Sequence, residues 1–472
     1  MDTVGNKLLV KMDRSPMSGL HRRLVLAAGL GIFLDGYDLV IIGVVLVQLK
    51  GQWHLLSQQI GLLGSAALAG ALVGSLAGGR IADVFGRKAI YIIDLLTFLV
   101  AAILCALAWN IYSLALFRFV LGMGVGADYP LSATYLAEFM PAPRRGSILS
   151  WTFGLWSFGA ITAGLVGYLC LLDVTNGWRW MFLFGALPAS CVVYLRGNLP
   201  ESPRWYLRHN QPEKAAKVVA ALTPDLSQEE IRQFLEESAK ADRPAAVSPL
   251  QLLRPPLLRS TLLVCVPWFL MDLIGYYLTI YTPLILGQLG FGSPQSRVMG
   301  SAILNASFLL GYIPLALLID KIGRIWPQII GFLGSAGALW LVGMASVHVH
   351  HEWHMIHGHA VKIVVAGTAT LAVIFIGMLL SQISNSFGPG NTTYVLAAEV
   401  YPTDIRATGH GFATAVSRLG AVASTYFLPV ICAGMSQIHF FFLLSGLSVV
   451  AAAATWLFRV NTTGRPLLQD VS

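Results

Sequence analysis

Two aspartates inside an apolar segment are the first residues of this chain that could do chemistry. Asp35 and Asp38 are the only charged residues in a run that extends from about Leu24 to Leu49. A carboxylate near the middle of a bilayer costs roughly 2.5–3.5 kcal/mol, so intramembrane acids are usually functional. The i, i+3 spacing puts both acids on one helix face, where they can share a water-filled cavity. We interpret them as proton-coupling residues; the alternative is a polar contact that only fixes helix packing.

The composition indicates that these acids lie in membrane-spanning helices. The chain has 472 residues, 56% hydrophobic and 11% charged, which excludes a soluble globular protein. A spanning helix needs about 20 mostly apolar residues. The sequence therefore predicts an all-α membrane protein with twelve transmembrane helices. The spans are placed at roughly 24–48, 59–78, 89–108, 112–136, 147–171, 178–197, 260–286, 297–319, 328–347, 363–398, 406–432 and 437–458.

The positions of the charges predict the orientation of these spans. The net charge is +8, but most of the 31 Lys and Arg residues fall on one side of the predicted spans. This asymmetry follows the positive-inside rule and puts both termini in the cytoplasm, so no nucleic-acid partner is expected. The sequence holds no phosphate-binding loop, zincin motif or nucleophile elbow. We expect a protein that is not an enzyme and that needs no cofactor or metal.

The two halves of the chain repeat each other. Residues 79–88 (GRIADVFGRK) resemble residues 317–324 (LLIDKIGR), and the pattern E-x-x-P-x-x-x-R occurs at 138–145 and at 399–406. Transporters build a midplane site between two such halves. We divide the chain into a six-helix half at 1–197, a cytoplasmic linker at 198–258 and a second six-helix half at 259–472. The candidate gating residues in the repeats are Gly79, Arg80, Asp83, Gly86, Arg87, Glu138, Arg145, Asp320, Gly323, Arg324, Glu399 and Arg406.

Over essentially its whole length the chain resembles the major facilitator superfamily, in its sugar-transporter-like branch. Residues 79–88 look like that superfamily's loop between the second and third helices, whose Asp and Arg latch the halves on the cytoplasmic side. Residues 200–205 (PESPRW) match the sugar-porter signature. Residues 35–38 (DGYD) look like metabolite:proton symporters, and 128–134 (DYPLSAT) are similar to phosphate:proton symporters. Sugar porters usually carry Pro-Glu-Thr after the last helix, where this chain has residues 459–463 (RVNTT), which weakens a sugar assignment.

Helix rise predicts which buried charges lie at one depth. Asp38 lies about 22 Å from the cytoplasmic edge, and Arg118, in a span that enters from outside, lies about 21 Å from it. Protonation of Asp38 would release Arg118 and change how the helices pack. The superfamily resemblance suggests the same pairing. A permanent structural ion pair is the alternative.

The second half holds the candidate substrate residues. Asp272 and Arg418 lie about 20 and 18 Å deep, near the midplane. A guanidinium binds a carboxylate or phosphate through two parallel hydrogen bonds, whereas a sugar needs neutral partners. Arg418 therefore indicates an anionic substrate, unless Asp272 merely neutralises it. The run 415–420 (AVSRLG) also looks like the same helix in organic-anion transporters.

Further candidates surround these charges. Asp128 and Asp94 lie nearer the cytoplasm. They could form a proton exit path, or they could anchor the loop at 79–88. Aromatic residues such as Tyr37, Trp156 and Tyr276 could stack on an aromatic acid, although such residues more often only pack helices. The triplet 388–390 (GPG) indicates a broken helix beside the cavity. Asn385 and Asn391 flank this break and are candidate substrate-binding residues.

A histidine-rich segment, 347–359 (VHVHHEWHMIHGH), lies outside the membrane in this scheme. Spacings such as His350 and His354 would suit a metal ion. Because no carboxylate or cysteine cluster accompanies them, we expect a solvated, pH-sensitive loop instead.

These patterns predict a monomeric secondary transporter in a bacterial-type inner membrane that takes up a small organic anion with protons. Symport is favoured over exchange because the fifth span lacks the Gly-Pro motif of the superfamily's antiporters, an argument by resemblance. Its partners would be protons, the anion and the lipid bilayer. A proton-coupled sugar or phosphate carrier, and a membrane sensor that kept the fold without transporting, are the alternatives.

Overall fold

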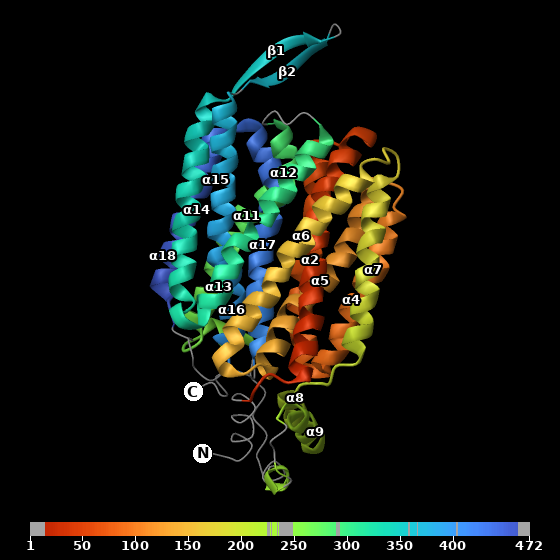
Figure 1. Ribbon diagram of the computed structural model, residues 1–472, viewed down its shortest axis with the longest axis vertical. Coiled ribbons are helices and arrows are strands. Elements are labelled where there is room, and N and C mark those ends of the chain that lie inside the picture. Colours follow the sequence, from red (N-terminus) through yellow and green to blue (C-terminus); the bar gives the residue numbers. More distant parts are fainter. Residues whose placement is uncertain are drawn as a thin grey trace.

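Twelve helical segments among the described residues are long and apolar enough to cross a membrane, as the sequence predicts. They come from a computed structural model that describes residues 15–223, 227, 229–233, 235, 249–288, 293–356, 359–365, 367–402 and 405–460. The helices run roughly side by side in one bundle (Figure 1). The start of α2 and the end of α18 lie at one end of the bundle, hereafter the termini end, and a β-hairpin marks the other, the hairpin end.

The first six spans are single helices within a few residues of their predicted bounds. They are α2 (Gly19–Gln52), α3 (Ser57–Phe85), α4 (Arg87–Ala106), α5 (Ile111–Phe139), α6 (Arg145–Cys170) and α7 (Gly177–Gly197). Local sequence sets several of these bounds. Ser18 forms a capping box with His21 at the start of α2, and the side chain of Asn110 accepts a hydrogen bond from the Ser113 amide at the start of α5.

The second six spans include two broken helices. They are α11 (Leu258–Gln288), α12 (Pro294–Ala306) with α13 (Phe308–Ile322), α14 (Ile325–Ala345), α15 (Thr368–Phe387) with α16 (Pro389–Glu399), α17 (Arg406–Gly434) and α18 (Gln437–Phe458). The break before Pro389 confirms the interruption that the GPG triplet predicts. The break at Ser307 does not follow from hydropathy, because a hinge leaves the mean apolar character of a span unchanged.

The linker carries short helices at the termini end: α8 (Pro203–Arg208), α9 (Pro212–Leu222) and the 3-10 turn Pro249–Leu253 (Figure 1). Further along the linker, Ser227 and Glu230 form a capping box, since the Glu230 amide donates to the Ser227 hydroxyl and Glu230 accepts from the Ser227 amide.

The histidine-rich segment is not an irregular loop. Strands β1 (His350–Ile356) and β2 (His359–Val365) pair antiparallel, with His350 opposite Val365. The helix of the tenth span consequently begins at Thr368 rather than near residue 363, because residues 363–365 belong to β2. Of the six histidines only His348 has a described side chain, which is exposed.

The two sequence repeats adopt matching local structures. Gly86 before α4 has φ +99° and Gly323 after α13 has φ +81°, a region that glycine enters without steric cost. Arg145 donates to the Met140 carbonyl and Arg406 to the Tyr401 carbonyl, five residues back in each case and both at 3.1 Å. The repeated patterns therefore encode the same turn geometry in both halves.

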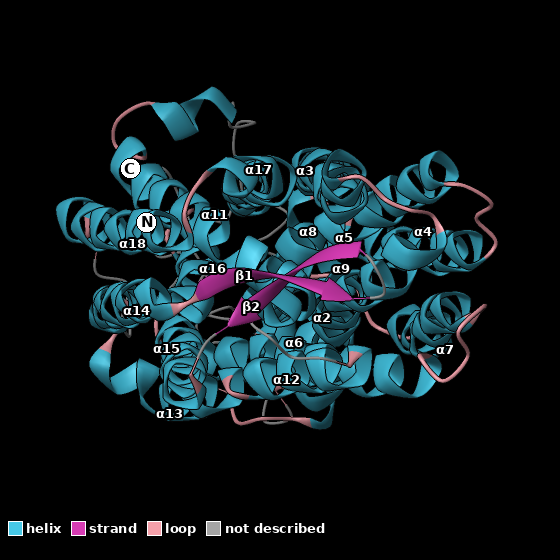
Figure 2. Ribbon diagram, turned by 90° about the horizontal axis from the view of Figure 1, so that it is seen from above, coloured by secondary structure: helices cyan, strands magenta, loops and turns pink. Residues whose placement is uncertain are grey.

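The halves contact each other through α3 against α17 and through α6 against α12 and α13 (Figure 2). Towards the hairpin end, the Tyr281 hydroxyl of α11 donates to the Thr425 carbonyl at 2.8 Å. The same hydroxyl lies 3.4 Å from the Ile60 carbonyl of α3, in the other half. At the termini end, α6 is hydrogen bonded to α13 and α16. The bundle is therefore closed above and below its centre.

Candidate functional site

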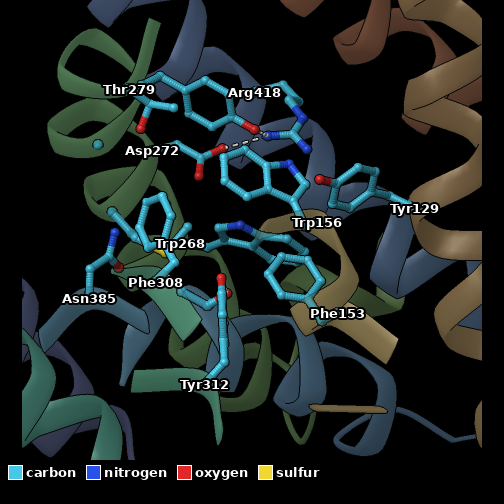
Figure 3. A pocket seen from close by; sticks show the side chains of 14 residues that line it. Tyr129, Phe153, Trp156, Trp268, Asp272, Thr279, Phe308, Tyr312, Asn385 and Arg418 are labelled. Atoms are coloured by element: carbon cyan, nitrogen blue, oxygen red, sulfur yellow. Dashed lines mark hydrogen bonds and ion pairs between the residues drawn. The ribbon is translucent and has the colours of Figure 1, made fainter. Parts of the chain in front are cut away.

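A cavity of about 60 Å³ lies between the two halves. Both halves line it: Tyr129 comes from α5, Trp156 from α6 and Arg418 from α17. It has room for only a few water molecules, which agrees with a bundle closed at both ends. We call this cavity the central pocket (Figure 3).

In the second half, residues at the two helix breaks line the central pocket. Phe308 follows the break at Ser307, and Asn385 and Gly390 flank the break at Gly388; all three line the cavity. A Cβ at Gly388 would lie 2.4 Å from the Pro327 carbonyl oxygen, so only glycine allows α14 to pack against this break. Broken helices at a midplane cavity are the usual construction of a transporter binding site.

Half of the residues that line the central pocket are aromatic. The Trp156 and Phe308 rings meet edge to face with centroids 5.5 Å apart, and Phe153 contacts Tyr312 at 6.0 Å. These contacts cross between the halves, since α6 belongs to the first half and α13 to the second. The aromatic residues that line the cavity are Tyr129, Phe153, Trp156, Trp268, Tyr276, Phe308 and Tyr312.

Arg418 supplies the charge at this pocket. Its Nη1 donates to Oδ2 of Asp272 at 3.0 Å and to the Tyr276 hydroxyl. Its guanidinium carbon lies 4.6 Å from the centroid of the Tyr129 ring. The predicted neighbours Asp272 and Arg418 thus form an ion pair, with 1% of each side chain exposed.

One edge of the Arg418 guanidinium remains available. Nε and Nη2 are buried and have no hydrogen-bond partner among the described residues, nor has Oδ1 of Asp272. Nε and Nη2 are the parallel pair of donors with which arginine binds a carboxylate bidentately. Arg418, a residue of the pocket wall, therefore keeps a two-donor edge without an acceptor at full hydrogen-bond distance, with the Tyr129 ring beside its guanidinium.

The chain matches the model of the sugar (and other) transporter family over residues 24–470. The chain belongs to that family. It is 31% identical to the putative metabolite transport protein YaaU of Escherichia coli over 97% of this chain and 96% of the relative. It is 27% identical to the niacin transporter NiaP of Acinetobacter baylyi over 98% and 99%. Other relatives are named inorganic phosphate transporters.

Solved structures confirm the fold of this transporter. The proton:xylose symporter XylE bound to 6-bromo-6-deoxy-D-glucose matches with a TM-score of 0.78 and 22% identity, over 95% of this chain and 97% of that one. The major facilitator fold and the sugar-transporter-like branch that the sequence indicates are therefore confirmed. The family is one of transporters, and this twelve-span membrane protein is not an enzyme.

Outside the central pocket, the transporter holds a second ion pair that depth predicts from sequence. Arg118 Nη1 of α5 lies 2.6 Å from Asp38 Oδ1 of α2, and the side chains are 0% and 4% exposed. The Phe182 ring lies 5.9 Å from the guanidinium carbon. Neither charged residue lines the central pocket. The pair therefore joins two helices of the first half rather than contacting a ligand.

Asp35 is a buried acid of α2 that forms no ion pair with a described residue. Its residue exposure is 2%, and Oδ2 has no hydrogen-bond partner among the described residues. It makes no ion pair within 4.0 Å in that part of the chain. Such a carboxylate is suited to carry a proton, because protonation removes an uncompensated buried charge.

A third cluster contains a residue that the sequence interpretation missed. Arg196, in the last turn of α7, contacts Asp128 at 2.8 Å and Asp94 at 3.5 Å, all buried. Its guanidinium carbon lies 3.5 Å from the Tyr91 ring centroid. Asp94, Asp128 and Arg196 all lie near the same membrane edge in sequence, which is the signal that could have found the cluster.

Two candidate substrate residues lie away from the pocket wall. The Tyr37 hydroxyl donates to the Met181 carbonyl of α7 at 2.6 Å, which turns the ring away from the second half. Asn391 accepts a hydrogen bond from the Ser150 hydroxyl at 2.9 Å and so joins α16 to α6 below the pocket. Trp156, Tyr276, Asn385, Asp272 and Arg418 do line the pocket.

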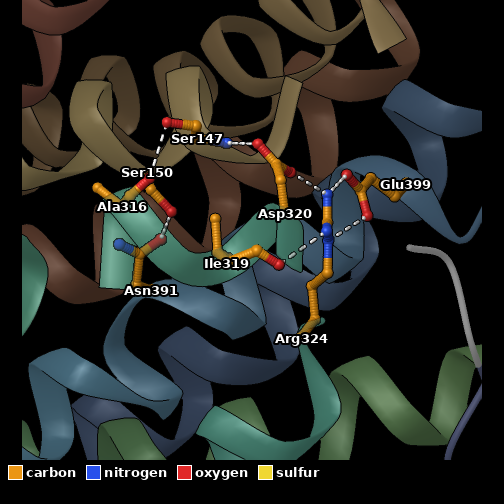
Figure 4. A network of polar contacts seen from close by, with 8 residues as sticks. All are labelled: Ser147, Ser150, Ala316, Ile319, Asp320, Arg324, Asn391 and Glu399. Atoms are coloured by element: carbon orange, nitrogen blue, oxygen red, sulfur yellow. Dashed lines mark hydrogen bonds and ion pairs between the residues drawn. The ribbon is translucent and has the colours of Figure 1, made fainter. Parts of the chain in front are cut away.

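At the termini end, polar contacts join the two halves of the transporter (Figure 4). Arg324 donates to both carboxylate oxygens of Glu399, at 3.0 and 2.8 Å, and to Asp320 at 3.0 Å. Asp320 in turn accepts from the backbone amide of Ser147 in the first half, at 2.9 Å. We call Ser147, Asp320, Arg324 and Glu399 the latch. The sequence repeats identify its three charged members.

The first-half counterpart of the latch is described only in part. Glu138 accepts from the Ser202 hydroxyl, and Glu201 accepts from the Lys88 amide at 2.9 Å beside Gly86. The sugar-porter signature thus holds the linker against the start of α4. The side chains of Arg80, Asp83 and Arg87, and the surroundings of Gly79, lie outside the described residues.

Proposed function

We propose that this transporter takes up a small aromatic carboxylate, or a closely similar organic anion, together with protons. The observation that carries the proposal is the buried, unpartnered Nε and Nη2 edge of Arg418 in the central pocket. A buried donor pair without an acceptor is costly, and a carboxylate satisfies both donors at once.

The pocket wall supports an aromatic substrate. Trp156, Phe308 and Tyr312 offer ring faces and edges at distances where an added ring gains stacking energy. The niacin transporters among the relatives are named for an aromatic carboxylic acid, the same chemical class.

Phosphate and sugars fit this wall less well. Each oxygen of a bound phosphate needs donors, and each sugar hydroxyl needs a donor or an acceptor of its own. Besides Arg418 and Asp272, the groups that could serve are Thr279, Asn385, the tyrosine hydroxyls and the tryptophan N–H groups, and they are spread among aromatic rings. A phosphate carrier remains the second candidate, because relatives carry that name.

Proton coupling would act at two ion pairs, one in the central pocket and one outside it. A substrate carboxylate at Nε and Nη2 would lie close to the Asp272 carboxylate, which contacts Nη1, so protonation of Asp272 would remove a like charge beside the bound anion. Asp35 and Asp38 lie in α2, outside the pocket wall. Protonation of Asp38 would weaken its contact with Arg118 and let α2 and α5 shift. The proton thereby offsets both the anionic charge and the desolvation of a carboxylate.

The latch would then control release. With the termini end facing the cytoplasm, as the positive-inside rule indicates, opening requires that the Asp320 carboxylate leave the Ser147 amide. It also requires that Asn391 leave Ser150. Outward reopening after release would re-form these contacts.

Uptake into proteoliposomes tests the proposal. With an inward proton gradient, we expect labelled benzoate or nicotinate to accumulate, and a protonophore to abolish the accumulation. Phosphate and xylose serve as the competing substrates. Accumulation of either of these without uptake of any aromatic acid would overturn the substrate class. Substrate binding without accumulation under any gradient would instead favour a sensor.

A further inference from the structure

A second cavity, of about 560 Å³, lies at the termini end of the second half. Four basic residues line it: Arg259 at the start of α11, Lys321 and Arg324 around the end of α13, and Arg459 after α18. No acidic residue lines it among the described residues. Arg324 is committed to the latch, whereas Arg259, Lys321 and Arg459 have exposed side chains. The cavity therefore gathers basic side chains from the start of α11 and from the carboxyl ends of α13 and α18, where they also offset the negative ends of the helix dipoles.

The start of α14 adds to this positive potential. Ile325 and Trp326, in the first turn of α14, line the same cavity. The first amides of a helix have no partner within it, and the helix dipole favours an anion there. Because α14 is 21 residues long, this is a full helix end beside the cluster of basic side chains.

Two exposed tryptophans place the cavity at the edge of the bilayer. Trp326 and Trp456 line it with ring centroids 5.6 Å apart, and they are 56% and 47% exposed. The Arg459 guanidinium carbon lies 4.0 Å from the Trp456 ring. Tryptophan is enriched at the level of the lipid headgroups, where its ring is apolar and its N–H is hydrated.

An apolar strip leads from the cavity into the membrane. Ile330 and Leu333 follow Trp326 at i+4 and i+7 on one face of α14, and both are about half exposed. Val449 shares a face of α18 with Trp456 in the same way and is 49% exposed. Helices α14 and α18 lie side by side (Figures 1 and 2). The basic cavity therefore continues into an apolar, lipid-facing strip. An amphiphilic anion matches both, with its charged group in the cavity and its apolar part along the strip.

We propose that this cavity binds the phosphodiester headgroup of an anionic phospholipid. Arg259, Lys321 and Arg459 hold the phosphate, the two tryptophans pack beside the glycerol region, and an acyl chain follows α14 and α18. Juxtamembrane basic residues attract anionic lipids in this way. A bound headgroup holds together the ends of α11, α13 and α18 next to Arg324, and so stabilises the second half beside the latch.

Lipid addition to the purified full-length protein in detergent tests this site. We expect phosphatidylglycerol to raise the thermal midpoint by about 2 °C or more. Phosphatidylcholine and inorganic phosphate should not raise it. In the variant Arg259→Gln/Lys321→Gln/Arg459→Gln, the apparent affinity for phosphatidylglycerol should fall at least about tenfold. Native mass spectrometry should show one retained phosphatidylglycerol in the parent protein and none in this variant.

The matched control removes three exposed basic residues elsewhere, in Arg22→Gln/Arg23→Gln/Lys217→Gln. It should keep the full response to phosphatidylglycerol. If the first triple variant does not fold, Lys321→Gln alone provides the comparison. An equal response of control and site variants would overturn the proposal, as would equal stabilisation by phosphatidylcholine. A shift produced by inorganic phosphate alone would show a soluble-anion site and overturn the lipid assignment.

Discussion

Arg118 Nη1 meets Asp38 through one short side-chain contact, 2.6 Å to Oδ1, and one longer contact, 3.4 Å to the backbone carbonyl, in the buried interior of the first half. Nε and Nη2 of Arg118 and Oδ2 of Asp38 have no hydrogen-bond partner among the described residues. A permanent structural pair would be expected to satisfy these atoms, because a buried unmade hydrogen bond costs about 1–3 kcal/mol. The sparse contact suits a pair that opens during the cycle.

Asp38→Asn tests whether this pair couples protons. We expect uphill accumulation to be lost, while exchange of labelled for unlabelled substrate persists, because Asn cannot carry the proton. The readout is proteoliposome uptake with and without a proton gradient. Unchanged uphill uptake would show that Asp38 is not a coupling residue.

The control for that variant addresses folding. Asp38→Asn leaves Arg118 buried without its counter-ion, which can cost about 3–5 kcal/mol. The double variant Asp38→Asn/Arg118→Gln removes both charges and should recover most of the thermal stability without recovering uphill uptake.

Arg418→Lys tests the bidentate edge. Lysine keeps the charge but offers no pair of parallel donors, so the apparent binding constant for an aromatic acid should rise about tenfold or more, equivalent to about 1.4 kcal/mol. Binding is measured by thermal shift or counterflow. The exposed substitution Arg22→Lys should leave the constant unchanged. An equally small effect at Arg418 would remove this residue from substrate recognition.

Gly31→Ala tests the packing of α2 on the Arg196 cluster. The added Cβ would lie 1.9 Å from Arg196 Nη2 and 2.5 Å from Asp128 Oδ2, so the ion pair must move. We expect a loss of about 1–3 kcal/mol of stability, measured by thermal unfolding. Gly19→Ala in the same helix meets no atom within 4 Å and should be neutral or slightly stabilising.

Asp320→Asn tests the latch. The substitution removes the carboxylate that accepts from both Arg324 and the Ser147 amide, so the termini end should open more often. A cysteine at Gly154 reports the change, because a Cβ there makes only ordinary contacts, 3.8 Å or more, with Tyr312. In a background without the five native cysteines, its labelling should accelerate several-fold. The isomorphous change Asp173→Asn, in an exposed turn at the other end, should leave the labelling rate as it was.

The fold could be predicted from sequence because the bilayer restricts which segments can cross it. A span must be apolar for about 20 residues, and charges mark its ends, so the twelve helices and two halves follow from composition. Fixed helix rise gives depth, which is why Asp38 with Arg118 and Asp272 with Arg418 could be paired in advance.

The depth of a residue in the membrane does not tell in which direction around the helix axis its side chain points. The sequence places Tyr37 among the candidate substrate residues, but its hydroxyl donates to Met181 in α7. Helix depth assigns no partner to Arg196, yet this residue holds Asp128 and Asp94 together. Which neighbour a buried side chain meets depends on the rotation and lateral packing of every helix, and hydropathy carries no information on either.

The sequence by itself determined the membrane class, the two repeated halves and the depths of the buried charges, since each follows from properties that vary along the chain. Only the tertiary structure decided which aromatic rings enclose Arg418, and that its Nε and Nη2 edge is unsatisfied. It also decided that basic ends of three helices converge beside Trp326 and Trp456. These features bring together residues far apart in sequence, and their relative positions exist only once the helices pack.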